Sequence, residues 1–146
     1  MTVSRHPGDD VDVAAVTAAC DTLGDRWSLP VVAALLEGPL RYTELRERVP
    51  AIAPNILASR LRQLELEGLV VASQYSERPP RFDYRLTADG AALADAVRLL
   101  GAWAAGRAGT VDPPTHAPCG TPLEVRWWCP ACREVPRPLL DETIFA

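Results

Sequence analysis

The sequence predicts a mainly α-helical (α+β) domain of short helices, one β-hairpin and a long final helix, followed by a small cysteine-containing tail. Apolar residues recur at helical spacing through most of residues 10–68. β-branched and aromatic residues are then frequent in residues 69–87, where two prolines interrupt them at the position of a turn. Helical spacing returns after Thr87. With 146 residues, the chain is long enough for one domain with a hydrophobic core and a small appendage.

The first two helices are expected over residues 10–24 and 28–38. In the first, apolar side chains fall at every third or fourth position and Gly24 ends the pattern. In the second, Pro30 would disturb the interior of a helix. We therefore expect Ser28 to be the N-cap, so that the helix begins late and Pro30 falls within its first turn.

The third and fourth helices are expected over residues 43–49 and 54–68, joined by the short link "PAIAP". Thr43 is the expected N-cap of the third helix, and Pro54 suits the first position of the fourth. Three leucines share one face of the fourth helix, which we expect to enter the core: Leu57, Leu61 and Leu64.

The stretch "LVVASQYSERPPRFDYRLT", residues 69–87, is typical of two strands joined by a tight turn. Thr87 is the expected N-cap of the fifth helix. Because this helix carries more apolar surface than a small domain covers alone, we expect it to pack with the first helix across a two-fold axis. The residues expected at this homodimer interface are Val13, Val16, Leu93, Val97, Leu100 and Trp103.

Three helices followed by a two-stranded hairpin form the layout of a winged helix-turn-helix domain. In that layout one helix enters the major groove of DNA and the hairpin, or wing, can reach the adjacent minor groove or its phosphates. The net charge is −4, but residues 38–85 hold eight arginines against six acidic residues. That excess favours a polyanion bound by one face, although charge alone fits a solvated surface better. The expected DNA-binding residues are Thr43, Asn55, Ala58, Ser59, Arg62, Gln63, Arg78 and Arg81.

The sequence gives no indication of catalysis or of membrane insertion. No nucleophile, base and orienting group recur at useful spacing, and the chain has just two histidines. No apolar run approaches the roughly 20 residues that span a bilayer, and the N-terminus carries no export signal. Four cysteines without such a signal favour a reducing cytoplasm. We therefore expect a non-enzymatic cytoplasmic protein that does not bind membranes.

Four stretches between about residues 13 and 106 resemble the HxlR-type bacterial transcriptional regulators: "GDRW", "GPLRYTELRERVP", "ILASRLRQLELEGLV" and "PPRFDYRLTADG". The resemblance implies a homodimeric winged-helix protein that binds inverted repeats in promoters, with a dimer interface built from the first and last helices. We expect a repressor in preference to an activator. The resemblance implies DNA contacts at Asn55, Ala58, Ser59, Arg62, Arg78 and Arg81.

A second interpretation uses the same fold. A winged helix can also bind protein within a larger transcription assembly, here docking through the cysteine-containing tail, because fold alone does not decide function. The positive face and the long fifth helix favour DNA binding by a dimer. The operator, the target genes and the existence of a small-molecule effector are left open by the sequence.

The sequence departs from the HxlR pattern at three places. Ala53 stands where a serine usually caps the recognition helix, and Pro30 interrupts the apolar start of another helix. Members that sense oxidants carry a reactive cysteine where this sequence has Ala14. Cys20 falls on a core-facing position, and it has no basic neighbour in the sequence that would favour its reactive thiolate. We therefore interpret Cys20 as a small buried hydrophobe in preference to a redox switch.

The tail "HAPCGTPLEVRWWCPACRE", residues 116–134, contains two pairs of metal-ligand residues, each pair separated by two residues, with nine residues between the pairs. Two ligands on a tight turn can each reach a tetrahedral zinc ion. We expect a structural zinc site formed by His116, Cys119, Cys129 and Cys132. The alternative is a degenerate ribbon whose strand and tryptophans pack on the winged domain.

The expected division of the chain therefore has five parts. They are a flexible N-terminal tail (1–10), a winged helix-turn-helix DNA-binding and dimerisation domain (11–107), a linker (108–115), a zinc-ribbon-like knuckle (116–136) and a C-terminal tail (137–146).

Overall fold

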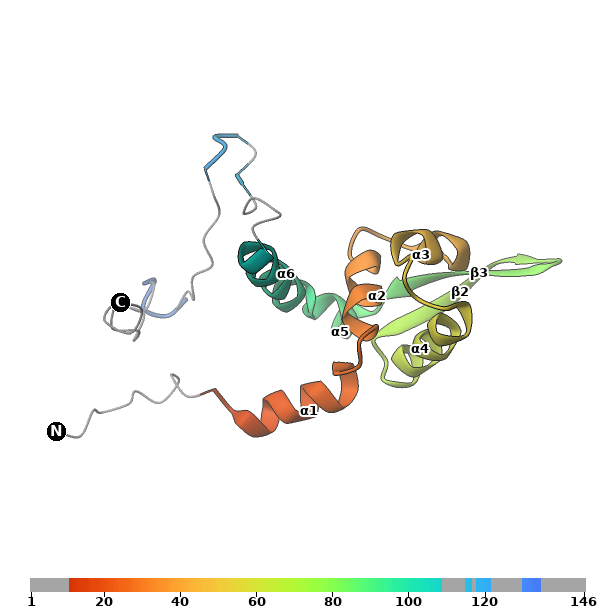
Figure 1. The fold of residues 1–146 in the computed structure, drawn as a ribbon, viewed down its shortest axis with the longest axis horizontal. Helices are drawn as coiled ribbons and strands as arrows, with labels where there is room; N and C mark the ends of the chain where they lie inside the picture. The colour runs from red at the N-terminus through yellow and green to blue at the C-terminus, as the bar shows by residue number, and fades with distance from the viewer. Residues whose placement is uncertain (1–10, 109–114, 117, 122–129, 135–146) are drawn as a thin grey trace.

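The computed structural model describes residues 11–108, 115–116, 118–121 and 130–134 (Figure 1). The predicted tails and residues 109–114 of the predicted linker lie outside this part of the chain. The order of helices, hairpin and long helix confirms the predicted fold class, and none of the described helices is long and apolar enough to cross a membrane. The elements are α1 (Val13–Leu23), α2 (Ser28–Leu35), β1 (Leu40–Arg41), α3 (Tyr42–Arg48), α4 (Pro54–Leu66), β2 (Val70–Glu77), β3 (Pro80–Leu86), α5 (Ala88–Ala92) and α6 (Ala94–Ala108).

The sheet has three antiparallel strands in the order β1-β3-β2, one strand more than the sequence predicts. β1 pairs Leu40 with Tyr84 of β3. A strand of two residues is too short to show the alternation by which strands are recognised in a sequence. β2 and β3 form the hairpin, whose last pair is Glu77 with Pro80. The hairpin continues past the helices and projects from the domain as a wing (Figure 1).

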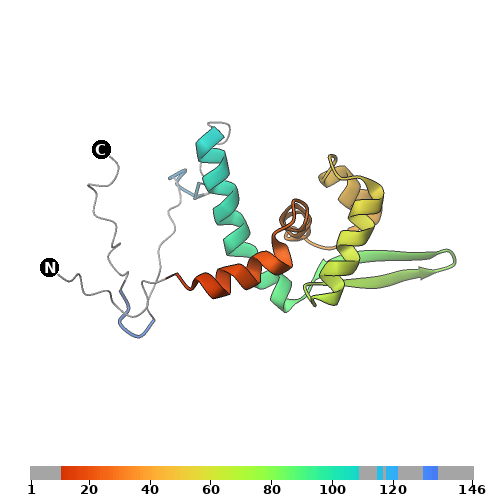
Figure 2. The ribbon, with the colours of Figure 1, turned by 60° about the horizontal axis from the view of Figure 1, so that its bottom comes forward.

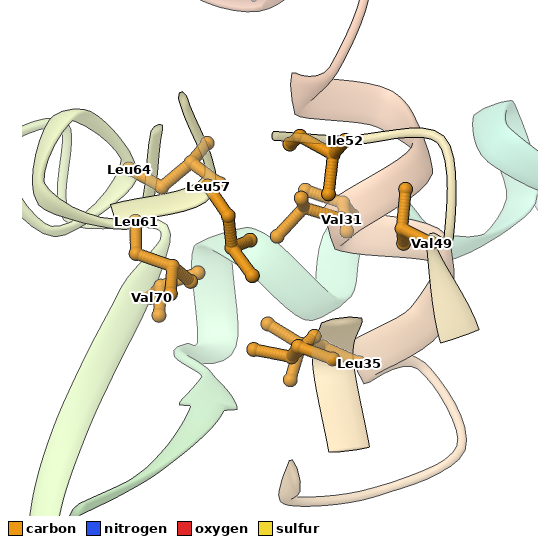
Figure 3. Close-up of a cluster of buried hydrophobic side chains, with 10 residues drawn as sticks. Val31, Leu35, Val49, Ile52, Leu57, Leu61, Leu64 and Val70 are labelled. Carbon is orange, nitrogen blue, oxygen red and sulfur yellow. The ribbon is translucent and has the colours of Figure 1, made fainter. Parts of the chain in front are cut away.

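The core lies where α2, α3 and α4 meet the base of the hairpin (Figure 3). All three leucines predicted on the inner face of α4 are 2% exposed or less. Burying such a side chain is worth about 1.5–3 kcal/mol, so this cluster fixes which face of α4 is turned outward. The buried apolar residues are Val31, Val32, Leu35, Leu45, Val49, Ile52, Leu57, Leu61, Leu64 and Val70.

α2 is capped by a different residue from the one predicted. Ser28 is the first residue of the helix and not its N-cap, and its fully buried hydroxyl donates to the Asp25 carboxylate. That carboxylate accepts hydrogen bonds from the backbone N–H groups of Trp27 (2.7 Å) and Ser28 (3.1 Å). Asp25 therefore provides the acceptor for N–H groups at the start of the helix that have no partner within it. Pro30 does lie in the first turn, as predicted, where a backbone N–H has no acceptor within the helix.

α3 begins two residues earlier than the cap prediction requires. Its first residue is Tyr42, so Thr43 lies inside the helix and the prediction that it is the N-cap is wrong. The N-cap is Arg41, whose backbone N–H donates to the Glu44 carboxylate (2.6 Å). The N–H of the N-cap residue is therefore bound by a carboxylate three residues later in the chain. The Thr43 side chain is exposed.

Thr87 caps the helix after the hairpin, as predicted. Its hydroxyl oxygen accepts the N–H of Gly90 (3.1 Å) and donates to the carbonyl of Gly68 (2.6 Å). The single helix expected there is divided at Leu93 into α5 and α6. A Cβ on Gly90 would lie 2.1 Å from the carbonyl oxygen of Leu69, so α5 can lie against the start of the hairpin only with glycine at this position.

α1 and α6 extend away from the core on the side opposite the hairpin tip (Figures 1 and 2). α1 buries none of its side chains. Cys20 on this helix is exposed, so the prediction that it is buried in the core is wrong. Helical periodicity identifies an apolar face but not what covers it, and the described part of the chain leaves this face exposed.

Candidate nucleic-acid interface

The outer face of α4 lies opposite the leucines that enter the core. This face presents an amide, a hydroxyl and a guanidinium group, which are groups that bind base edges and phosphates. Ala58 in the middle of the face is half-buried. The predicted recognition residues that are exposed on α4 are Asn55, Ser59, Arg62 and Gln63.

Arg60 on the flank of α4 forms an ion pair with Asp25 (Nη1–Oδ2, 3.0 Å), and both side chains are about a quarter exposed, 24% and 26%. Partial burial raises the pKa of the Asp25 carboxyl, but hydrogen bonds from the Ser28 hydroxyl and the Trp27 N–H, with the Arg60 charge, outweigh burial and lower that pKa below its ordinary value. The ionised carboxylate therefore joins α4 to the start of α2.

Two further hydrogen bonds hold the ends of α4. At its start, the Tyr42 hydroxyl of α3 donates to the Pro54 carbonyl (2.6 Å). Near its end, the Glu65 carboxylate accepts the N–H of Ala72 in β2 (3.2 Å). Ala53 precedes the helix without a side-chain cap. α4 is therefore fixed relative to both α3 and the wing.

The tip of the wing carries the two arginines that the sequence places there. Arg78 lies in the two-residue turn and Arg81 is the second residue of β3, and both are exposed. The Ser76 hydroxyl donates to the Pro79 carbonyl (3.0 Å), and the Gln74 side chain donates to the Ser76 carbonyl (3.0 Å). These bonds restrain the tip, so the arginines project on an ordered support.

A shallow groove lies between the start of α3 and the wing. The guanidinium carbon of Arg41 is 4.8 Å from the centroid of the Tyr75 ring, a favourable contact between a cation and an aromatic face. The structure brings the predicted residues Thr43 and Arg81 together here and adds Arg41, which sequence reasoning missed. In the sequence, the only indication of a role for Arg41 was its position directly before the third helix. The groove is lined by Arg41, Tyr42, Thr43, Tyr75, Pro80, Arg81, Phe82 and Tyr84.

Tyr84 connects this groove to α4. Burial raises the pKa of the Tyr84 hydroxyl above its ordinary value and the Glu65 carboxylate raises it further, whereas the Arg62 charge lowers it. Tyr42, which lines the groove, donates its hydroxyl hydrogen to the Pro54 carbonyl at the start of α4, so the groove adjoins α4. We call the outer face of α4 and this groove together the α4–wing surface.

Comparison with known proteins decides the family. Residues 22–111 match the HxlR-like helix-turn-helix family. The chain belongs to this family. An HTH-type transcriptional regulator of Methanothermobacter thermautotrophicus is 35% identical over 96 residues, which cover 66% of this chain and 73% of that relative. The HTH-type transcriptional regulator YodB of Bacillus subtilis is 36% identical over 87 residues, which cover 60% and 78%.

Solved structures agree with this HxlR-like assignment. The reduced form of the transcriptional regulator YodB from B. subtilis has a TM-score of 0.58 and 31% identity, covering 70% of this chain and 100% of that chain. The redox regulator HypR in its reduced form has a TM-score of 0.61 and 29% identity, covering 64% and 93%. The protein is therefore a winged helix-turn-helix regulator of the HxlR-like family, and its family role is DNA binding.

The residues predicted at the dimer interface of this HxlR-like chain fall into two groups. Leu93 and Val97 are half-buried and pack against the core of the chain itself. The inner part of α6 is therefore anchored to its own domain, while α1 and the outer part of α6 present apolar surface. The exposed members are Val13 (74%), Val16 (49%), Leu100 (50%) and Trp103 (64%).

The cysteine-containing tail of the HxlR-like chain begins beyond the family match. Of the four predicted ligands, Cys129 lies outside the described residues. His116 Nδ1 is 3.2 Å from Cys119 Sγ, so the structure brings these two together. Within the described residues, no group of three His, Cys, Asp or Glu side chains is close enough to hold a metal ion, and Cys132 is therefore not gathered with them.

Proposed function

We propose that the protein is a homodimeric, sequence-specific transcriptional regulator that binds an inverted-repeat operator, with α4 in the major groove and the wing on the adjacent minor groove. The α4–wing surface is the observation that carries this proposal. A helix whose outer face is polar, and whose inner face and both ends are held by the protein, suits readout of base edges in a major groove.

Base contacts and backbone contacts are assigned to different parts of this surface. On α4, the Arg62 guanidinium suits the two acceptors of a guanine edge, and the Asn55 amide suits an adenine edge. The groove and the wing tip hold cations and a hydroxyl, which suit phosphates because phosphate contacts need charge and not sequence. Backbone contacts are assigned to Arg41, Thr43, Arg78 and Arg81.

Dimerisation supplies the second half of the operator contact. α1 and the outer part of α6 expose the apolar side chains of Val16, Leu100 and Trp103. When such side chains form a contiguous patch, the patch marks a surface that a protein partner covers. Packing across a two-fold axis buries it in a self-complementary interface. The two α4 helices then enter major grooves about one helical turn apart, or a multiple of it. A dimer that covers two such grooves excludes other proteins from that stretch of promoter, which favours repression.

Binding-site selection with the full chain tests the proposal. From a random pool of double-stranded DNA, we expect enrichment of an inverted repeat. Arg62→Ala should weaken binding by about 1–3 kcal/mol and relax the preference at one symmetric pair of positions. Arg85→Ala is the matched control, because Arg85 lines a hollow beside α2 and α6, away from the groove. A pool without enriched sequences would contradict the proposal and favour binding to a protein partner.

A further inference from the structure

The groove between the start of α3 and the wing contains aromatic rings for which phosphate contacts provide no role. Its arginines and the Thr43 hydroxyl suit phosphates, but the face of an aromatic ring is electron-rich and does not attract an anion. Tyr75 and Phe82 line the groove and are nevertheless 43% and 41% exposed. Rings exposed beside cations suit a ligand that has both an aromatic part and a negative charge.

An irregularity in β2 sets the position of Tyr75. Phe82 and Arg81 are adjacent in β3, but their partners in β2 are two positions apart, with Tyr75 between them. Tyr75 is therefore the extra residue of a β-bulge. Bulges redirect a side chain and are frequent beside functional sites. Here the Tyr75 ring lines the groove, where the guanidinium carbon of Arg41 lies 4.8 Å from its centroid.

The alternation of side chains along β3 adds to the apolar wall of the groove. Pro80, Phe82 and Tyr84 stand two positions apart, so they fall on one face of the strand, and all three line the groove. Tyr42 contributes a further ring from α3, and its hydroxyl is held by the Pro54 carbonyl (2.6 Å). The aromatic wall is therefore built from three elements and is fixed before any ligand binds.

The charged groups that line the groove are positive. Arg41 and Arg81 are among the described residues that line it, and none of these residues is acidic. The Glu44 carboxylate is close in sequence, but it accepts the backbone N–H of Arg41 (2.6 Å). Guanidinium groups bind carboxylates through charge-assisted hydrogen bonds. The volume of the groove is about 490 Å³, within the range of about 300–1,000 Å³ that is usual for small-molecule sites.

We propose that this groove binds a small planar aromatic carboxylate. The aromatic part packs against Tyr75 and Phe82, and the carboxylate accepts hydrogen bonds from Arg41 and Arg81. Such a ligand contacts both the rings and the cations of the groove, whereas a phosphate contacts the cations alone.

The ligand and the operator exclude each other. Arg41, Thr43 and Arg81 are the groups assigned to DNA phosphates, and a bound carboxylate occupies them and adds a negative charge to the DNA-binding surface. The ligand therefore releases the regulator from its operator. This regulatory step rests on the proposed DNA-binding function, whereas binding of the ligand to the groove does not.

Ligand binding by the full chain without DNA is the first test, with 2-naphthoate as the probe and titration calorimetry as the measurement. We expect one saturable site per chain. Neutral 2-naphthamide should bind about tenfold more weakly because it lacks the charge. Decahydro-2-naphthoate should bind about threefold more weakly because it lacks the aromatic ring. Absence of saturable 2-naphthoate binding, or equal affinity for the three compounds, would overturn the proposal.

Variants of the groove test where the probe binds. Arg41→Gln and Arg81→Gln should each weaken 2-naphthoate binding about tenfold. Phe82→Leu keeps an apolar side chain but removes the ring, so it should weaken binding about threefold. Arg85→Gln is the control, because it removes an exposed arginine that lines the hollow beside α2 and α6. Unchanged affinity in all three groove variants would place the probe elsewhere and overturn the assigned site.

Operator binding in the presence of the probe tests the regulatory step. At ten times its Kd, 2-naphthoate should raise the apparent Kd for a selected operator about tenfold for each groove that it occupies. Phe82→Leu should respond less to the probe but keep the salt dependence of operator binding, because it removes no cation. A probe that binds without changing operator affinity would overturn mutual exclusion. Failure to select any operator would instead contradict the proposed DNA-binding function, and the calorimetric result would still decide the ligand site.

Discussion

Arg41 and Arg81 face the groove from two elements that are far apart in the sequence. If both contact phosphates, replacing either with alanine should weaken binding evenly across DNA sequences. Each replacement should also reduce the slope of log K against log salt concentration by about 0.9, the contribution of one phosphate contact. Band-shift titrations at several salt concentrations measure this, with Arg85→Ala as the control. Unchanged slopes in both variants would remove the groove from the interface.

The Asp25 carboxylate should stabilise the fold in a pH-dependent way. Because the pKa of Asp25 is lower in the folded protein than its ordinary value of about 3.9, its contribution is complete above that pH and is lost as the pH falls through the folded pKa. Asp25→Asn should therefore lower the free energy of unfolding by about 1–3 kcal/mol at neutral pH, and by less in acid. Urea denaturation at both pH values measures the difference.

The control for this carboxylate is Asp21→Asn, which changes an exposed carboxylate on α1 and should have little effect at either pH. An Asp25→Asn effect of equal size at neutral and acid pH would show that the charge of Asp25 is not the cause.

Predictions about single residues were correct where helical spacing determines which side chains are buried. They were wrong where contacts with other residues determine the role of a side chain. Leu57, Leu61 and Leu64 were correctly placed in the core because their spacing repeats with the helix. The predictions that Ser28 and Thr43 are N-caps were wrong, because nearby carboxylates accept the backbone N–H groups at the starts of those two helices. No local pattern indicates that Asp25 binds Arg60, since the partners belong to distant elements.

At the scale of elements, α5 is positioned by a glycine that touches the backbone of the hairpin. A Cβ added by Gly90→Ala would lie 2.1 Å from the Leu69 carbonyl oxygen and 3.1 Å from the Leu86 side chain. The helix must then shift, so we expect a loss of about 1–3 kcal/mol in the free energy of unfolding. Gly101→Ala is the matched control, because nothing lies within 4 Å of its added Cβ. Thermal unfolding of the two variants should move in opposite directions.

The secondary-structure features that the sequence did not predict are those that form through contacts with other parts of the fold. β1 consists of two residues that pair with β3, so its identity depends on a strand that lies more than forty positions later. The break between α5 and α6 at Leu93 carries no proline or capping signal of the kind that ends a helix in a sequence. The turn at Arg78 and Pro79 fell within one residue of its predicted place because prolines mark turns directly.

At the scale of the whole molecule, the exposed apolar residues of α1 and α6 should control the oligomeric state. Leu100→Glu places a charge in the proposed interface, so we expect monomers in sedimentation and loss of operator binding in the same variant. Leu66→Glu is the control for oligomeric state, because Leu66 is 82% exposed at the end of α4, outside α1 and α6. A Leu100→Glu protein that sediments as a dimer would contradict the proposed interface.

The error for Cys20 belongs to this scale too. The apolar pattern of the first helix was recognised, and Val13, Val16 and Cys20 share in it, but a face that is apolar can be covered by its own chain or by another. The sequence of one chain does not distinguish these cases, whereas exposure of the whole face in the folded chain favours the second.

Asp25 follows Gly24, the residue that ends α1, and it is bound to α4 through Arg60. The helix proposed for dimer contact and the helix proposed for DNA contact therefore share one attachment point. A short connection held by hydrogen bonds therefore lies between the two proposed contacts. Each base pair inserted between two half-sites turns the second groove by about 35° around the DNA axis. We therefore expect the proposed dimer to respond to the rotational phase of the half-sites as well as to their sequence.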